Sequence, residues 1–182
     1  MSDGGDHESA KQDAKKTKII VDTSSWINVF RVDLINYLIE NFYIFMTPKI
    51  EEEILGGKGF AEDAELFEKL SGEGHIQIVS PKIIPEKIKY EISAASGEIE
   101  IVACAMEREG CVVLIDDSRV YRLMDRFDLK YISSANIILD AYLTARIDKD
   151  ETYRLLEVLR TVLRDEVIDK ATEVLEDAGS KA

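Results

Sequence analysis

The sequence predicts an α/β fold with a mostly parallel central sheet. Short apolar runs typical of buried strands alternate with amphipathic segments typical of helices, and there is no internal repeat. Two of these runs end directly in acids, at Asp22 and at Asp116 and Asp117. The length of 182 residues and the 46% apolar content suit one domain with a sizeable core. We therefore expect one domain over 18–178, preceded by a disordered polar tail over 1–17.

The expected strands are short apolar runs bounded by turn residues. They lie at 18–22, 43–47, 75–79, 111–115 and near 130–132. Right-handed helical crossovers place the carboxyl ends of parallel strands at one edge of the sheet, where ligand sites in open α/β sheets form. The acids that follow the first and fourth runs are therefore expected at the same edge.

Helices are expected between the strands, and their ends follow capping chemistry. Thr23 and the two serines after it can begin a helix that carries apolar side chains on one face, namely Trp26, Val29, Phe30, Leu34 and Leu38. Pro48 suits the first turn of a helix that Gly56 and Gly57 end. The remaining helices are expected at 61–70, 86–95, 98–108, 118–127 and over most of 134–178.

Further acids flank the same predicted edge. Glu98 and Glu100 open a helix directly after Gly97, and Glu53 ends a run of three glutamates. Carboxylates that converge repel one another unless they bind a hard cation, and Mg²⁺ or Mn²⁺ suits an all-oxygen site.

Each acid taken alone also has an ordinary explanation. Asp22 suits the N-cap of a helix, Glu98 complements a helix dipole, and the run 51–53 suits a solvated face. Convergence of several acids on one edge favours the metal site over three separate coincidences.

Four motifs carry a resemblance to a known family. They are Val21-Asp22-Thr-Ser-Ser-Trp-Ile, Pro48-Lys-Ile-Glu-Glu-Glu53-Ile-Leu, Gly97-Glu98-Ile-Glu100-Ile and Ile115-Asp116-Asp117. In this order the chain resembles a PIN domain, and in particular the small archaeal and bacterial PIN proteins related to VapC-type toxins. The resemblance covers about 19–176, including the late pattern Leu-Arg-Asp-Glu-Val-Ile-Asp-Lys.

The resemblance implies a three-layer α/β/α sandwich and a metal-dependent nuclease, usually an endoribonuclease. The catalytic acids it implies are Asp22, Glu53, Glu98 and Asp117. The metal ligands it implies are drawn from Asp22, Glu98, Glu100, Asp116 and Asp117, with Glu98 and Glu100 as competitors and Ser24 supporting Asp22. One or two Mg²⁺ or Mn²⁺ ions would lower the pKa of a bound water for in-line attack on RNA, and no histidine is required as base.

The chain departs from the family pattern beside the acidic pair. Tyr121 stands where the branch usually has an arginine, with Arg122 one position later. Ser133 replaces a glycine. These departures concern substrate handling more than metal binding.

A basic stretch follows the acidic pair. If 118–127 is one helix, Arg119, Arg122 and Arg126 share a face that either holds RNA phosphates or is solvated and pairs with Asp125.

The formal net charge of −13 excludes a protein that coats nucleic acid or anionic membranes by bulk charge. RNA binding is therefore expected to be local and metal-assisted. No apolar run approaches the roughly 18 residues that span a membrane, and Cys104 and Cys111 suit a core in a reducing compartment. The expected location is the cytoplasm.

The expected partners are RNA, a second copy in a homodimer and an antitoxin protein, since toxin-type PIN proteins are generally dimers and many bind one. The alternative is a catalytically silent PIN-like module that binds RNA or protein. A phospho-acceptor receiver domain is disfavoured, because Glu98 and Glu100 lie on a helix after Gly97.

Overall fold

The computed structural model describes residues 16–91 and 96–179. Most of the expected tail therefore lies outside the described residues, and the first strand begins at Thr17. None of the described helices is long and apolar enough to cross a membrane.

The described strands form one sheet in which every pairing is parallel, as predicted. The strands are β1 (Thr17–Val21), β2 (Phe42–Met46), β3 (Ile76–Ile78), β4 (Val112–Leu114) and β5 (Tyr131–Ile132). Their order is β3-β2-β1-β4-β5, with β1 at the centre. The chain thus winds from β1 to one edge of the sheet and then crosses back to the other, which separates β1 from β4 in sequence while pairing them in space.

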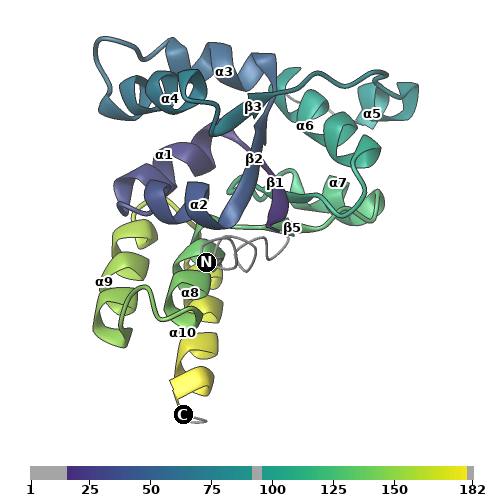
Figure 1. The fold of residues 1–182 in the computed structure, drawn as a ribbon. Helices are drawn as coiled ribbons and strands as arrows, with labels where there is room; N and C mark the ends of the chain where they lie inside the picture. Colours follow the sequence, from purple (N-terminus) through teal and green to yellow (C-terminus); the bar gives the residue numbers. More distant parts are fainter. Residues whose placement is uncertain (1–15, 92–95, 180–182) are drawn as a thin grey trace, which may run out of the picture.

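Helices cover both faces of this sheet and complete the predicted three-layer sandwich. Figure 1 shows α1 and α2 on one face, α5 to α7 on the other, and α8 to α10 extending from the end of the sheet that β5 forms. The helices are α1 (Thr23–Arg31), α2 (Ile35–Asn41), α3 (Pro48–Leu55), α4 (Glu62–Gly72), α5 (Glu86–Glu91), α6 (Ser96–Glu107), α7 (Tyr121–Arg126), α8 (Ser134–Leu143), α9 (Lys149–Arg160) and α10 (Asp165–Gly179).

The single helix expected after Asp22 is two helices in the structure. Asp33 adopts a left-handed backbone conformation (φ 56°), and the Leu34 amide donates to the Val29 carbonyl at 3.1 Å to close the turn. Aspartate tolerates this conformation better than most residues. The apolar pattern continued across the break because α1 and α2 bury their apolar faces in the same core.

One other helix begins later than predicted, and the end of another lies outside the described residues. The described part of α5 ends at Glu91, and residues 92–95 of the expected helix lie outside the described residues. The helix α7 begins only at Tyr121, so 118–120 form a turn. Arg119 therefore precedes the helix.

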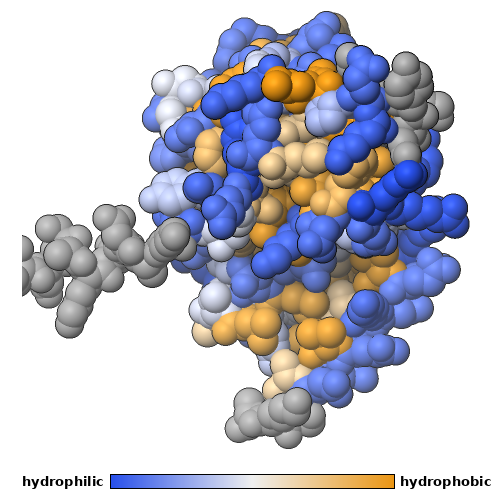
Figure 2. Space-filling model, turned by 90° about the vertical axis from the view of Figure 1, so that its right-hand side faces the viewer, coloured by the Kyte–Doolittle hydropathy of each residue, from blue (hydrophilic) through white to orange (hydrophobic). Residues whose placement is uncertain are grey.

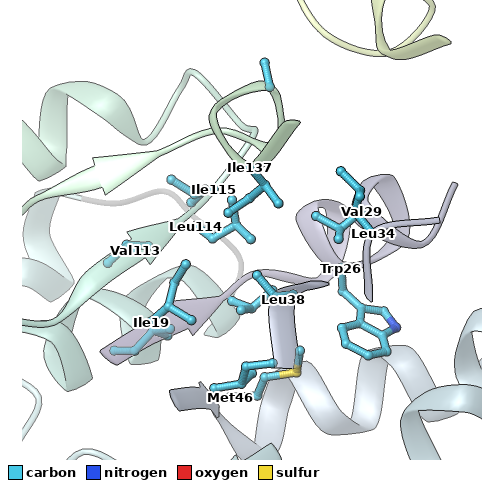
Figure 3. Close-up of a cluster of buried hydrophobic side chains, with 14 of the residues drawn as sticks. Ile19, Trp26, Val29, Leu34, Leu38, Met46, Val113, Leu114, Ile115 and Ile137 are labelled. Atoms are coloured by element: carbon cyan, nitrogen blue, oxygen red, sulfur yellow. The ribbon is translucent and has the colours of Figure 1, made fainter. Parts of the chain in front are cut away.

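The core includes buried side chains on both faces of the sheet, from α1, α2 and α8 and also from α6 and α7. Figure 3 shows the side chains of β1 and β4 meeting those of α1, α2 and α8. Trp26 is fully buried, its ring packs edge-on against Phe67 at 5.7 Å, and its Nε1 donates to the Asp63 carbonyl at 3.2 Å. Both cysteines are buried and free, as predicted.

Replacing Trp26 with alanine should lower the free energy of unfolding by about 3–5 kcal/mol, because a large buried ring and its hydrogen bond are lost. Denaturation in urea, followed by circular dichroism, measures the change. Phe60→Ala is the matched control, since the Phe60 side chain is 96% exposed, and it should change stability by less than about 0.5 kcal/mol. Equal effects of the two substitutions would contradict this packing.

Candidate functional site

Asp22 and Asp116 lie at the same edge of the sheet because β1 pairs with β4. The pairing places Val21 beside Leu114, and the Asp22 amide continues the ladder by donating to the Leu114 carbonyl at 3.0 Å. The two acids thus follow neighbouring parallel strands, as the sequence predicted. Each is half-buried.

Asp22 caps α1 and also faces the other acids. Its Oδ2 accepts hydrogen bonds from the Ser24 amide (3.1 Å) and from the Ser24 hydroxyl (2.5 Å). Burial raises the pKa of Asp22, the Ser24 hydrogen bonds oppose that rise, and the charge of Asp116 adds to it. The ordinary role as an N-cap and the predicted contact with Ser24 are therefore both present.

Asp116 is held by hydrogen bonds from two helices. Its Oδ1 accepts from the Ser134 amide at 2.8 Å, and its Oδ2 accepts from the Ser134 hydroxyl at 2.5 Å and from Asn28 Nδ2 at 2.8 Å. Asn28 Oδ1 in turn accepts from Arg31 at 2.9 Å. These contacts fasten the end of β4 to α1 and α8, and they leave Asp116 fewer free lone pairs for a metal than Asp22 has.

Asp117 is tied to Arg119. The Arg119 guanidinium contacts both carboxylate oxygens, and the Arg119 amide donates to Asp117 Oδ1 at 2.9 Å. The hydrogen bonds from Arg119 lower the pKa of Asp117. The Arg119 side chain is 82% exposed, so this ion pair is a surface contact that contributes little to stability.

The prediction that three arginines share one helical face is wrong. Arg119 lies in the turn before α7, which leaves only Arg122 and Arg126 on the helix. Both are exposed. The local apolar pattern favoured a helix from 118 onward, but the Asp117 side chain bonds the Arg119 amide instead and forms a turn.

Glu53 and Glu98 approach the aspartates from α3 and α6. Glu53 Oε2 accepts from the Thr23 hydroxyl at 2.7 Å, and a methyl group added at Gly97 would contact Glu53 Oε1 at 3.4 Å. Burial raises the pKa of Glu98, followed by the charges of Asp117, Asp22 and Glu53, while Arg119 acts in the opposite direction. The charges of three other carboxylates, which come from three different elements, therefore act on Glu98.

Glu100 lies on another side of α6 from Glu98. Two residues along a helix correspond to about 200° of rotation, and the charge of Glu100 acts on Lys49 and on Cys104. Its Oε2 atom is buried without a hydrogen-bond partner among the described residues. Of the two competing glutamates, Glu98 is the one beside the aspartates.

An open hollow of about 520 Å³ lies against the acidic pair. It is lined by Asp116 and Asp117 and by three arginines from separate elements, with Arg31 at the end of α1, Arg119 before α7 and Arg164 before α10. Arg31 and Arg164 make no salt bridge with any residue in 16–91 or 96–179. Arg122 and Arg126 do not line the hollow.

Sequence reasoning missed Asn28, Arg31 and Arg164. Asn28 is a buried polar residue inside the apolar face of α1, and that mismatch was the one local signal. Arg164 lies in the late pattern Leu-Arg-Asp-Glu-Val-Ile-Asp-Lys, which supported the resemblance without indicating where the arginine lies. Only the folded chain brings α9 and α10 back to β4.

No three histidine, cysteine, aspartate or glutamate side chains within the described ranges lie close enough, as they stand, to hold one metal ion. The donor chemistry nevertheless fits a hard cation. Every ionisable donor at the edge is a carboxylate, and the pKa values of Asp22 and Glu98 are raised, burial first and neighbouring acids next. A bound cation would offset both contributions.

Comparison with known proteins identifies the family of the chain. The family model that matches the chain describes a PIN domain and aligns with residues 18–177. No curated protein matches the chain. The matched range includes the five strands described above and all the acids at the sheet edge. The chain belongs to the PIN-domain family.

Proposed function

We propose that this protein is a Mg²⁺- or Mn²⁺-dependent endoribonuclease. One observation carries the proposal: Asp22, Glu53 and Asp117 all raise the pKa of Glu98, although the four acids come from the ends of β1 and β4 and from α3 and α6. A fold gains no stability from such convergence, because like charges repel. PIN domains are generally nucleases that use divalent metal ions, and this membership supports the same reading of the acids.

The roles follow from the contacts of each acid. Asp22, Glu98 and Asp117 would hold the metal, with Glu53 close by and Asp116 as a positioning residue whose oxygens already accept three hydrogen bonds. A bound divalent ion would lower the pKa of a water molecule and neutralise charge on the scissile phosphate. Glu100, about 200° around α6 from Glu98, is left outside the ligand set.

The substrate phosphates would lie against the arginines of the hollow. Arg31 and Arg164 form no salt bridge within the described residues, although the charge of Arg164 acts on Asp117. Guanidinium groups bind phosphate oxygens in pairs. No histidine serves as base in this mechanism, and His75 lies elsewhere, 3.8 Å from Glu73 in the exposed turn before β3. The carboxylates thus supply the metal ligands, and the arginines orient the strand.

A silent binding module is the second candidate, and the Arg119 ion pair favours it. The guanidinium occupies both oxygens of Asp117, so it competes with a metal there. Because the pair is exposed, Arg119 is free to release Asp117 and to contact a phosphate instead. The two candidates therefore differ in whether metal displaces Arg119.

The narrower proposal is that the protein is the toxin of a toxin–antitoxin pair in the cytoplasm and acts as a homodimer. Its support is the resemblance to VapC-like PIN proteins alone. Growth arrest on expression, relieved by the product of a neighbouring reading frame, tests the toxin role. Light scattering tests the dimer.

Asp22→Asn should lower the rate of cleavage of a fluorogenic single-stranded RNA by about 100-fold or more, because a metal ligand is lost. Asparagine keeps the N-cap, so α1 should stay intact. Asp33→Asn is the matched control, since Asp33 is exposed and asparagine tolerates its positive φ. Cleavage that survives either Asp22→Asn or EDTA would exclude this metal site.

Arg119→Ala should tighten Mn²⁺ binding, measured by isothermal titration calorimetry, because it removes the guanidinium that competes with the metal for Asp117. Arg122→Ala removes the same charge from the exposed face of α7 and should leave Mn²⁺ affinity unchanged. If neither the wild type nor Arg119→Ala binds Mn²⁺, the silent module becomes the better proposal.

Glu98→Gln should raise the melting temperature of the metal-free protein at pH 7. The folded-state pKa of Glu98 lies above its ordinary value of 4.5, so the folded state binds the proton more tightly than the unfolded state does. The wild type therefore loses stability as pH rises through the raised pKa, and the advantage of the neutral variant appears over that same interval.

Thermal melts in EDTA between pH 4 and pH 7 measure this gain. Glu173→Gln, on the exposed side of α10, should show no gain that grows with pH. Adding Mn²⁺ should stabilise the wild type more than Glu98→Gln. A gain independent of pH would show that Glu98 does not sit among charged acids.

A further inference from the structure

A second hollow, of about 570 Å³, lies between β5, α8 and α10, and we call it the Tyr131 groove. Its volume falls within the range of about 300–1,000 Å³ that is usual for ligand sites. Ser118 and Arg164 line both this groove and the hollow beside the acids. The two hollows are therefore neighbours that share a wall next to Asp117.

One wall of the groove is apolar. It is formed by Val167, Ala171 and Val174 of α10 and by Leu139 of α8, and the Val174 side chain is 43% exposed. Figure 2 shows hydrophobic surface between hydrophilic side chains in the lower part of the molecule, where Figure 1 places α8 to α10. A groove of this size with an apolar wall suits a flat apolar group.

An aromatic pair stands at one end of the groove. The rings of Tyr121 and Tyr131 stack with centroids 4.7 Å apart and planes 28° apart. Their hydroxyls are engaged elsewhere, since Tyr131 donates to Asp125 at 3.2 Å and Tyr121 donates to the Ile115 carbonyl at 3.4 Å. Each ring covers one face of the other, so the outer face of Tyr131, which lines the groove, is the stacking surface that the protein holds in place.

Asn136 supplies a polar group whose orientation is set. Its Oδ1 accepts from the Ser133 amide at 2.9 Å and from the Ser133 hydroxyl at 3.0 Å, which closes the capping box of α8. This arrangement identifies Nδ2 as the other end of the amide, and Nδ2 has no hydrogen-bond partner among the residues that the structure describes. Its two N–H donors are available to an acceptor on the edge of a base.

The charges that line the groove favour an anionic occupant. Arg164 and Lys170 line it, and neither forms a salt bridge within the described part of the chain, whereas Glu166 is the one acidic residue that lines it. The lining of the groove therefore carries a net positive charge in a chain whose net charge is −13. A nucleotide combines the flat base, the acceptor edge and the phosphate that these groups match.

We propose that the Tyr131 groove binds the nucleotide next to the scissile phosphate of a single-stranded RNA. The base stacks on Tyr131, Asn136 donates to its edge, and Arg164 holds the phosphate between this nucleotide and the acids. This proposal rests on the proposed function, because the strand enters the groove from the hollow beside Asp117. It makes the groove, and not the acidic edge, the source of any base preference.

The first experiment measures RNA binding without cleavage. Fluorescence anisotropy follows a labelled random-sequence RNA of eight nucleotides, with EDTA, on proteins that carry Asp22→Asn. Tyr131→Ala and Val174→Trp should each weaken binding by about fivefold or more, since one stacked base is lost or blocked. Tyr131→Phe should restore it. Leu143→Trp, at a 63% exposed apolar position of α8, is the matched control and should bind as the parent does.

The second experiment measures base preference with an active Asp22. Proteins cleave a randomised RNA pool in Mn²⁺, and sequencing of the product ends gives the preferred base beside each cut. Tyr131→Ala should flatten that preference and raise KM more than it lowers kcat. Asn136→Asp keeps the capping acceptor but removes the donors, so it should change which base is preferred, whereas an added charge alone weakens all sequences equally.

The two experiments separate this proposal from the proposed function. If the wild type does not cleave RNA but Tyr131→Ala and Val174→Trp still weaken binding, the nuclease proposal is overturned and the groove proposal stands. If the wild type cleaves RNA and both variants leave binding and base preference unchanged, the groove proposal is overturned and the nuclease proposal stands. If Val174→Trp alters the mass in solution but not RNA binding, the groove is an interface between copies and the proposal is overturned.

Discussion

The pairing of β1 with β4 is the contact on which the candidate site depends. It joins two strands that lie far apart in the sequence, and the hydrogen bond from the Asp22 amide to the Leu114 carbonyl extends the ladder to the first acid. Because β1 is central, burial on both faces fixes its position. The acids that follow β1 and β4 are therefore held in fixed positions, which a loop would not provide.

The same geometry places like charges together at a cost. The fold reduces that cost in different ways at different acids: Ser24 bonds Asp22, Asn28 and Ser134 bond Asp116, and Arg119 pairs with Asp117. Glu98 has no such bond within the described residues, and its pKa is raised. The protein therefore folds although the negative charge of Glu98 is poorly compensated. A bound cation would compensate that charge.

Much of this arrangement was predictable because it depends on local patterns. Apolar runs located the strands, and the parallel topology then brought Asp22 and Asp116 together. The failures arose where a side chain overrode the pattern, as at Asp33, which breaks the first helix, and at Asp117, which turns the chain before α7. Arg164 could not be placed at all, because its position depends on how the last helices pack.

The dependence on Arg164 has a consequence for how the protein is made. The acids at the sheet edge and Arg31 are all translated by residue 117, whereas Arg164 follows only with the turn between α9 and α10. Under the function proposed above, a nascent chain would carry its metal ligands and Arg31 well before Arg164 completes the arginine side of the hollow. Full phosphate binding would then be reached only when nearly the whole chain has been made.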